Sequence, residues 1–160
     1  MSRVRSSGIL LYRYAPDASI EVWIVHMGGP FWAKKDNRAW SIPKGEHHDG
    51  EDSFAVARRE FAEEIGAEAP DVAYAHLGDF PQASGKMVSA FAAESDFSVD
   101  QVRSNTFTLE WPPRSGVLRD FPEIDDAGWF ALETARSKLV KGQVAILDAL
   151  QSRLREGRPV

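Results

Sequence analysis

Three glutamates in the middle of the chain stand at a spacing that brings carboxylates together. Glu60, Glu63 and Glu64 occupy positions i, i+3 and i+4, so on a helix their side chains share one side. Three like charges this close repel one another, a cost that a nearby cation would remove. Mg²⁺ is the natural candidate, because it takes hard oxygen ligands and binds substrate phosphates through its open positions. The spacing also leaves a plainer alternative open, a solvated glutamate-rich face with an Arg59–Glu63 ion pair.

The acidic charge of the chain is concentrated around these glutamates. The 160 residues carry a net charge of −5, and residues 46–68 alone hold eight acids and two bases, a local balance of −6. With no basic tract and a pI near 5.4, binding of long nucleic acid through its backbone is not expected. The chain has no cysteine, which excludes disulfides, thiol nucleophiles and zinc–thiolate sites. The chemistry must therefore come from carboxylates, histidines or a metal held by oxygen.

Length and hydropathy favour one domain in the cytoplasm. A chain of 160 residues favours a single compact core, so we expect one domain spanning 1–160. The longest apolar runs fall far short of the roughly 20 residues that span a bilayer. The N-terminal residues lack the sustained hydrophobic region of a secretory signal. We expect a cytoplasmic monomer or homodimer without a membrane partner.

The elements that must position the glutamates follow from periodicity and turn residues. The segment 53–65 is predicted as a helix, capped by Asp52 or Ser53 and stopped by Gly66. A second helical segment, 132–154, is predicted with an interruption near Gly142. Strands are predicted where β-branched and aromatic residues run or alternate between turn residues, at 6–14, 20–26, 39–42, 72–80, 86–93, 105–111 and 127–130. The mixture predicts an α/β (α+β) fold in which helices cover a mixed sheet.

The complete segment around the glutamates resembles the Nudix box. Gly45, five residues, Glu51 and seven residues lead into Arg59-Glu60-Phe61-Ala62-Glu63-Glu64-Ile65-Gly66-Ala67, and every fixed position of the box is matched. The segment Trp40-Ser-Ile-Pro-Lys-Gly45 is similar to the approach to the box in hydrolases of the diadenosine polyphosphate type. The resemblance implies the Nudix fold, a mixed sheet sandwiched between helices, and a hydrolase that acts on a nucleoside diphosphate linked to another moiety.

The same resemblance implies a metal site. Glu60 and Glu64 would be the principal ligands of Mg²⁺ or Mn²⁺, Glu63 would share that shell, and the Gly45 carbonyl would complete it.

The resemblance also implies catalytic and substrate-binding residues, and for each of these a second interpretation stays open. Glu123 precedes Trp129 by six residues, as a loop glutamate does in the family, so it is the candidate general base or extra metal ligand. In the alternative, Glu123 is only a solvated loop acid and Glu63 is the general base. Arg59 joins the catalytic set as the residue that orients the helix and loop through an ion pair with Glu51. Lys44, and along a longer polyphosphate Lys35, are candidates for phosphate contacts, with ordinary surface lysines as the alternative.

The function implied is a Mg²⁺-dependent pyrophosphohydrolase that uses in-line attack of water on a small nucleotide, of the NTP or dinucleoside polyphosphate type. Two alternatives stay open: an ADP-ribose or ADP-sugar hydrolase, and a nucleotide-sensing Nudix module that does not cleave its ligand. Retention of three mutually repelling glutamates disfavours the sensor. The absence of a basic channel disfavours RNA processing.

Overall fold

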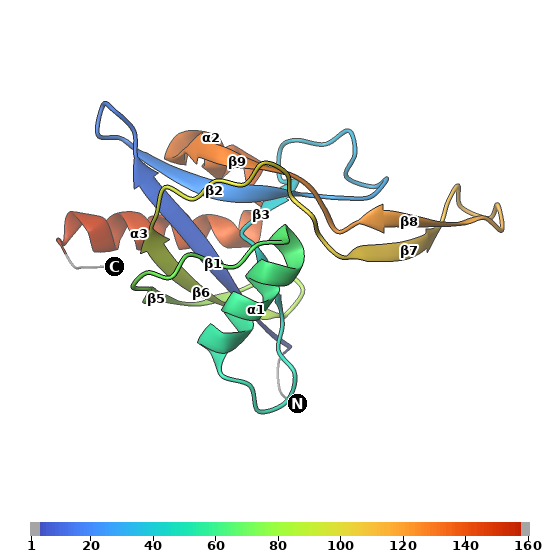
Figure 1. The fold of residues 1–160 in the computed structure, drawn as a ribbon, viewed down its shortest axis with the longest axis horizontal. Helices are drawn as coiled ribbons and strands as arrows, with labels where there is room; N and C mark the ends of the chain where they lie inside the picture. The colour runs from blue at the N-terminus through green and yellow to red at the C-terminus, as the bar shows by residue number, and fades with distance from the viewer. Residues whose placement is uncertain (1–3, 158–160) are drawn as a thin grey trace.

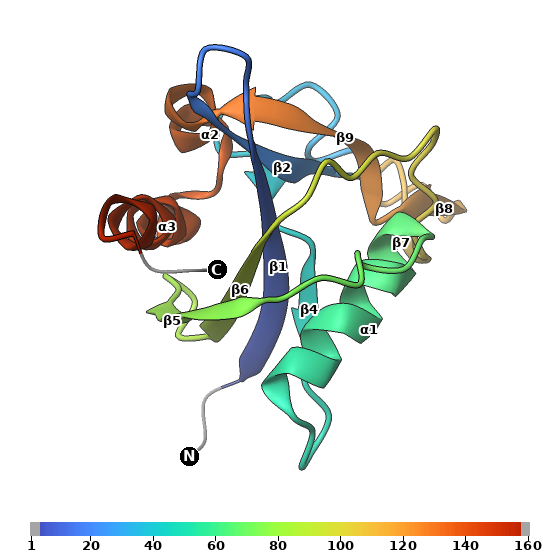
Figure 2. The same cartoon turned by 60° about the vertical axis from the view of Figure 1, so that its left-hand side comes forward.

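A mixed sheet lies between helices in the computed structural model, which describes residues 4–157 (Figures 1 and 2). Within these residues the main sheet has the strand order β3-β2-β1-β6-β5, with β4 paired to β1 and β9 paired to β2. Strands β7 and β8 form a separate hairpin that projects from the body (Figure 1). The strands are β1 Arg5–Tyr14, β2 Ile20–Met27, β3 Trp40–Ser41, β4 Lys44–Glu46, β5 Ala75–Pro81, β6 Met87–Glu94, β7 Thr106–Glu110, β8 Leu118–Pro122 and β9 Ile124–Ala131.

The helices lie on opposite faces of the sheet, as expected for a sheet sandwiched between helices. Helix α1 spans Ser53–Ile65 and covers one face, while α2 (Leu132–Lys138) and α3 (Val144–Arg155), joined by a 3₁₀ turn at Lys141–Gln143, cover the other (Figure 2). None of the helices within 4–157 has the length and apolar character needed to cross a membrane.

Two hydrophobic cores explain this arrangement. Side chains alternate along β1, so Leu10 packs with α2 and α3, whereas its neighbours Ile9 and Leu11 pack with Phe61 of α1. All four side chains are fully buried. Because β1 is buried on both faces, it reads as a continuous apolar run, and it pairs in parallel with β6.

The predicted helix at 53–65 is confirmed at both ends. The Asp52 carboxylate accepts a hydrogen bond from the Ala55 amide at 3.0 Å, which satisfies a free N–H of the first turn. Gly66 ends the helix in the left-handed region (φ +80°) and donates its N–H to the Ala62 carbonyl at 2.8 Å. Both capping interactions lie within four residues along the chain, so the sequence alone could specify them.

Two strands were not predicted, and one was predicted too short. Strand β4 has three residues and lacks apolar periodicity; its pairing with β1 fixes it as a strand. Strand β8 contains Arg119, Asp120 and Pro122 and exists through its pairing with β7. Strand β9 starts at Ile124 rather than 127, because β2 pairs with it over that length. The predicted helix 132–154 is interrupted as expected, between α2 and α3.

Candidate active site

The three glutamates of α1 lie in different environments. Glu64 is buried (7% exposed), whereas 45% of the Glu63 side chain and 17% of the Glu60 side chain are exposed. An evenly solvated glutamate face is therefore wrong for this helix. The predicted Arg59–Glu63 contact is present, with 4.0 Å between Nε and Oε1.

Glu64 is a buried carboxylate held between α1 and β4. Its Oε1 accepts a hydrogen bond from the backbone N–H of Lys44 at 3.0 Å. Burial raises the pKa of Glu64 to about 8; the Lys44 bond opposes this rise, and the charges of Glu123 and Glu60 add to it. At neutral pH the Glu64 carboxyl group therefore favours its protonated, uncharged form unless a cation lies beside it.

Glycine at position 45 lets β4 approach Glu60. A Cβ atom at this position would lie 2.0 Å from the Glu60 carboxylate, closer than any side chain permits. Burial raises the pKa of Glu60, and the negative charge of Glu63 contributes to the rise. The backbone of β4 therefore lies against the carboxylates of Glu60 and Glu64 on α1.

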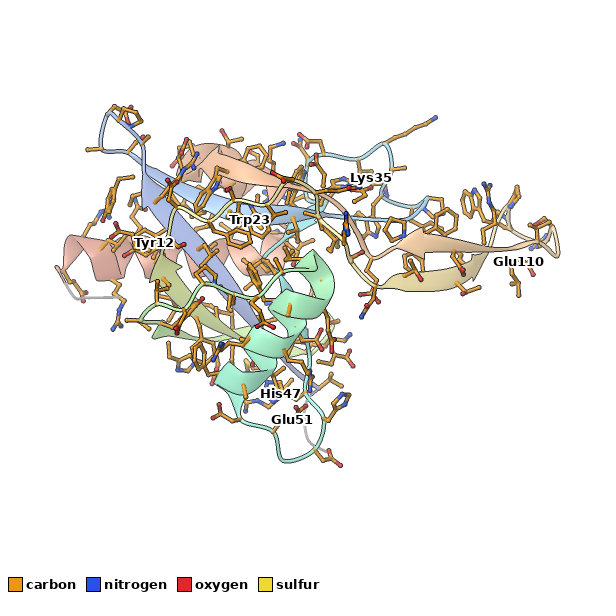
Figure 3. All side chains as sticks on the ribbon, viewed as in Figure 1. Tyr12, Trp23, Lys35, His47, Glu51 and Glu110 are labelled. Atoms are coloured by element: carbon orange, nitrogen blue, oxygen red, sulfur yellow. The ribbon has the colours of Figure 1, made fainter. Side chains whose placement is uncertain are left out.

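Arg59 connects the start of the box to its glutamates. Its guanidinium forms the predicted ion pair with Glu51, and the structure therefore confirms this pair. It also donates to the Glu46 carbonyl and to Glu60 Oε1, each at 3.2 Å. Glu51 lies in the loop that precedes α1 (Figure 3), and Arg59 braces this loop against the helix.

Glu123 faces the box from the junction between β8 and β9. Its backbone is fixed on both sides: its N–H donates to the Asn105 carbonyl at 2.9 Å, and its carbonyl accepts from the Gly28 N–H at 2.8 Å. The side chain is exposed, yet its charge contributes to the raised pKa values of both Glu60 and Glu64. The tertiary structure therefore brings this glutamate to the carboxylates of α1.

The two candidate lysines are placed differently. Lys44 lies on β4, and its positive charge acts on Glu64, lowering the pKa of that carboxyl group against the effect of burial. Lys35 lies on the loop between β2 and β3 (Figure 3), with its ammonium 5.4 Å from the centre of the Trp32 ring. Among residues 4–157 no direct contact joins Lys35 to the glutamates of the box.

The donor set suits a hard divalent cation, although it is not arranged around one. Within the described residues, no three acidic or histidine side chains converge closely enough to hold a metal. Glu60 instead contacts Arg59, and Glu64 contacts Lys44. The groups available are oxygen donors only, one of them a buried carboxylate whose charge lacks an ionic partner at bonding distance.

Sequence reasoning missed a histidine beside this site. His26 lies near the end of β2, where it is buried, and its Nδ1 lies 2.6 Å from the Asp125 carboxylate of β9. These residues are 99 positions apart, and no sequence motif signals their contact.

Comparisons with known proteins agree with this geometry. The model of the NUDIX domain family matches residues 4–150. The C. elegans Ap4A hydrolase in a binary complex is 22% identical, with a TM-score of 0.62, over 96% of this chain and 98% of that chain. The NUDIX domain of Shewanella oneidensis NrtR complexed with ADP ribose is 16% identical, with a TM-score of 0.65, over 96% of this chain and 90% of that chain.

A third solved structure, the Nudix hydrolase RenU from M. smegmatis, is 17% identical with a TM-score of 0.60, over 99% of this chain and 89% of that chain. The comparison with curated proteins gives no match. At these identities the solved structures support the fold, and the family match covers nearly the whole chain. The chain therefore belongs to the Nudix family of hydrolases.

Proposed function

We propose that this Nudix hydrolase is a Mg²⁺- or Mn²⁺-dependent pyrophosphohydrolase. Its substrate would be a nucleoside diphosphate linked to another moiety, of the NTP or dinucleoside polyphosphate type. The observation that carries the proposal is the buried Glu64 carboxylate, which lies near Glu60 and faces Glu123. Keeping such a group charged at neutral pH requires a cation beside it.

The cation would be held by oxygen atoms from α1 and β4. The ligands are Glu60, Glu64, Glu63 and the Gly45 carbonyl, and Arg59 keeps Glu60 and the preceding loop in place when no ion is bound. A bound divalent cation neutralises charge on the phosphoryl oxygens and favours ionisation of a bound water. Glu60 and Glu64 supply the negative charge that retains it.

Glu123 would act as the general base. The attacking water forms a new bond from its oxygen to phosphorus, the P–O bond to the leaving phosphate breaks, and the water's proton passes to the Glu123 carboxylate. Carboxylates that bind a cation have a lowered proton affinity, so Glu60 and Glu64 are poorer bases than a loop glutamate. Glu63 is the alternative base.

The lysines would contact phosphate oxygens. Lys44 is favoured because it lies on β4 directly before Gly45 and its charge acts on Glu64. Lys35 would extend the contact along a longer polyphosphate chain. An ADP-ribose or ADP-sugar substrate is the second candidate, since the NrtR domain of the same fold is complexed with ADP ribose.

A substrate panel tests the proposal. The purified chain is incubated with NTPs, dinucleoside polyphosphates, ADP-ribose and NADH, with Mg²⁺ or Mn²⁺ and separately with EDTA, and the products are resolved by chromatography. We expect metal-dependent cleavage of at least one nucleotide, and its loss in Glu64→Gln. Full turnover in excess EDTA would refute the metal role. Tight nucleotide binding without cleavage would favour the sensing module instead.

A further inference from the structure

Glu123 lies at the junction between the projecting hairpin and the main sheet. Strand β8 ends at Pro122 and pairs with β7, whereas β9 starts at Ile124 and pairs with β2 (Figure 1). The register between β2 and β9 shifts between His26 and Met27, close to this junction. A shift of this kind disrupts the ladder locally and re-aims the side chains beside it. Contacts outside the strand ladder are therefore needed to fix the direction of Glu123.

Ser104 supplies a side-chain contact at this junction. Its Oγ accepts a hydrogen bond from the Ile124 N–H at 3.1 Å. The same hydroxyl has one proton, which it can donate to the Asn105 carbonyl at 2.8 Å or to the Ile124 carbonyl at 3.3 Å. The Asn105 carbonyl in turn accepts from the Glu123 N–H at 2.9 Å. Ser104 thus joins the residue that follows Glu123 to the carbonyl that holds Glu123 itself.

The end of β2 closes the opposite side of this segment. Gly28 donates its N–H to the Glu123 carbonyl at 2.8 Å, and a Cβ atom at position 28 would lie 2.1 Å from the Pro122 carbonyl oxygen. Ile124 is 5% exposed and belongs to the core cluster that contains Phe61 of α1. The backbone around Glu123 is therefore held on both sides, and the first residue of β9 is anchored to the helix of the box.

We propose that Ser104 is a positioning residue that holds Glu123 opposite the carboxylates of α1. This role rests on the proposed hydrolase function, in which Glu123 is the general base. The contacts of Asn105 and Gly28 come from backbone atoms, whereas that of Ser104 comes from its side chain, so one substitution removes it. Loss of the hydroxyl frees the Ile124 N–H and lets the junction shift. Because a small misplacement of a catalytic group can cost up to about 10²-fold in rate, kcat should fall while substrate binding is kept.

Amide hydrogen exchange on the metal-free chain tests this contact without any substrate. In the wild type we expect the amide protons of Glu123 and Ile124 to exchange slowly, because both are hydrogen-bonded. Ser104→Ala should speed exchange at both positions by about tenfold or more. Ser115→Ala is the matched control, because Ser115 Oγ accepts from the Val117 N–H, also at 3.1 Å, in the loop between β7 and β8. The control should leave both amides unchanged. Unchanged exchange at both positions in Ser104→Ala overturns the positioning role.

A double-mutant cycle with Glu123→Gln tests whether Ser104 acts through the base. We expect Ser104→Ala to lower kcat about tenfold to thirtyfold, with KM within about twofold of the wild type. In the Glu123→Gln background the same substitution should lower kcat by no more than about twofold, because the group that Ser104 positions is already lost. Ser104→Thr keeps the hydroxyl and should keep kcat within about threefold of the wild type. The control Ser115→Ala should match the wild type.

The outcomes separate this role from the proposed hydrolase function. An unchanged kcat in Ser104→Ala, or an equal loss in the wild-type and Glu123→Gln backgrounds, overturns the positioning role. An equal loss in Ser104→Thr and Ser104→Ala overturns the assignment to the hydroxyl. If no nucleotide of the panel is cleaved, the hydrolase proposal fails, and hydrogen exchange still decides whether Ser104 holds the Glu123 segment.

Discussion

Replacing Glu64 by glutamine should stabilise the metal-free protein while abolishing its activity. Folding transfers this carboxyl group into a buried position that raises its pKa from 4.5 to about 8. Each unit corresponds to about 1.4 kcal/mol, so the full penalty on the charged form has a ceiling of about 5 kcal/mol. Glutamine keeps an oxygen that can accept the hydrogen bond from Lys44 and carries no charge.

The sign of the pH dependence follows from proton binding. Between about pH 4.5 and about pH 8 the unfolded chain has lost the Glu64 proton while the folded chain keeps it. The wild type therefore loses stability as pH rises through this window, and the penalty is nearly complete above it. Glu64→Gln should match the wild type near pH 5 and exceed its free energy of unfolding by about 3 kcal/mol or more at pH 8.5.

Urea and thermal unfolding in EDTA measure this difference. For a chain of this size the expected gain corresponds to a rise in Tm of roughly 10 °C at pH 8.5. Glu63→Gln is the matched control, because it makes the same substitution one position earlier on the helix at an exposed carboxylate, and it should give a much smaller gain in stability at pH 8.5 than Glu64→Gln. Adding Mg²⁺ should stabilise the wild type at pH 8.5 but not Glu64→Gln. A Glu64→Gln difference that stays flat from pH 5 to pH 8.5 would refute the reasoning.

Three further predictions concern catalysis and the core. Glu60→Gln should lower kcat by about two orders of magnitude or more with folding intact, because it removes charge from the cation site; near-normal steady-state rates would contradict the ligand assignment. Glu123→Gln should lower kcat by a factor of roughly 10² to 10⁴ with little change in KM, and it should flatten the acidic limb of the pH–rate profile. The control Asp126→Asn should lower kcat by less than about tenfold. If both behave alike, the base lies elsewhere. Gln143→Leu should cost about 1–3 kcal/mol in urea unfolding, because the buried Ile42 N–H loses its acceptor at 2.9 Å; an unchanged midpoint would contradict this.

The structure also shows which neighbouring acid is the better control for Glu123→Gln. Asp125 and Asp126 are adjacent acids that look equivalent in the sequence, and both were natural comparisons for Glu123. Asp125 binds His26 at 2.6 Å, whereas the Asp126 carboxylate accepts from the Ala127 N–H beside it at 2.8 Å. Substituting Asp125 would therefore disturb its contact with the buried His26, so Asp126 is the appropriate control.

The sequence by itself determined the helix of the box and the identity of its chemical groups. Asp52 and Gly66 end α1 where short-range capping rules place them, and the i, i+3, i+4 spacing puts the glutamates on the same helix. The Glu51–Arg59 pair was also predictable, because the box itself relates these positions. All of these features depend on residues that are close along the chain.

Only the tertiary structure decided how the three glutamates differ and what faces them. Glu64 is buried because β4 pairs with β1 and brings the Lys44 amide against α1, 20 residues away in the sequence. Glu123 reaches the box because β9 pairs with β2, and His26 meets Asp125 through the same pairing. Strand register joins residues that no local pattern relates, and burial then sets the pKa of a carboxyl group that the sequence shows only as glutamate.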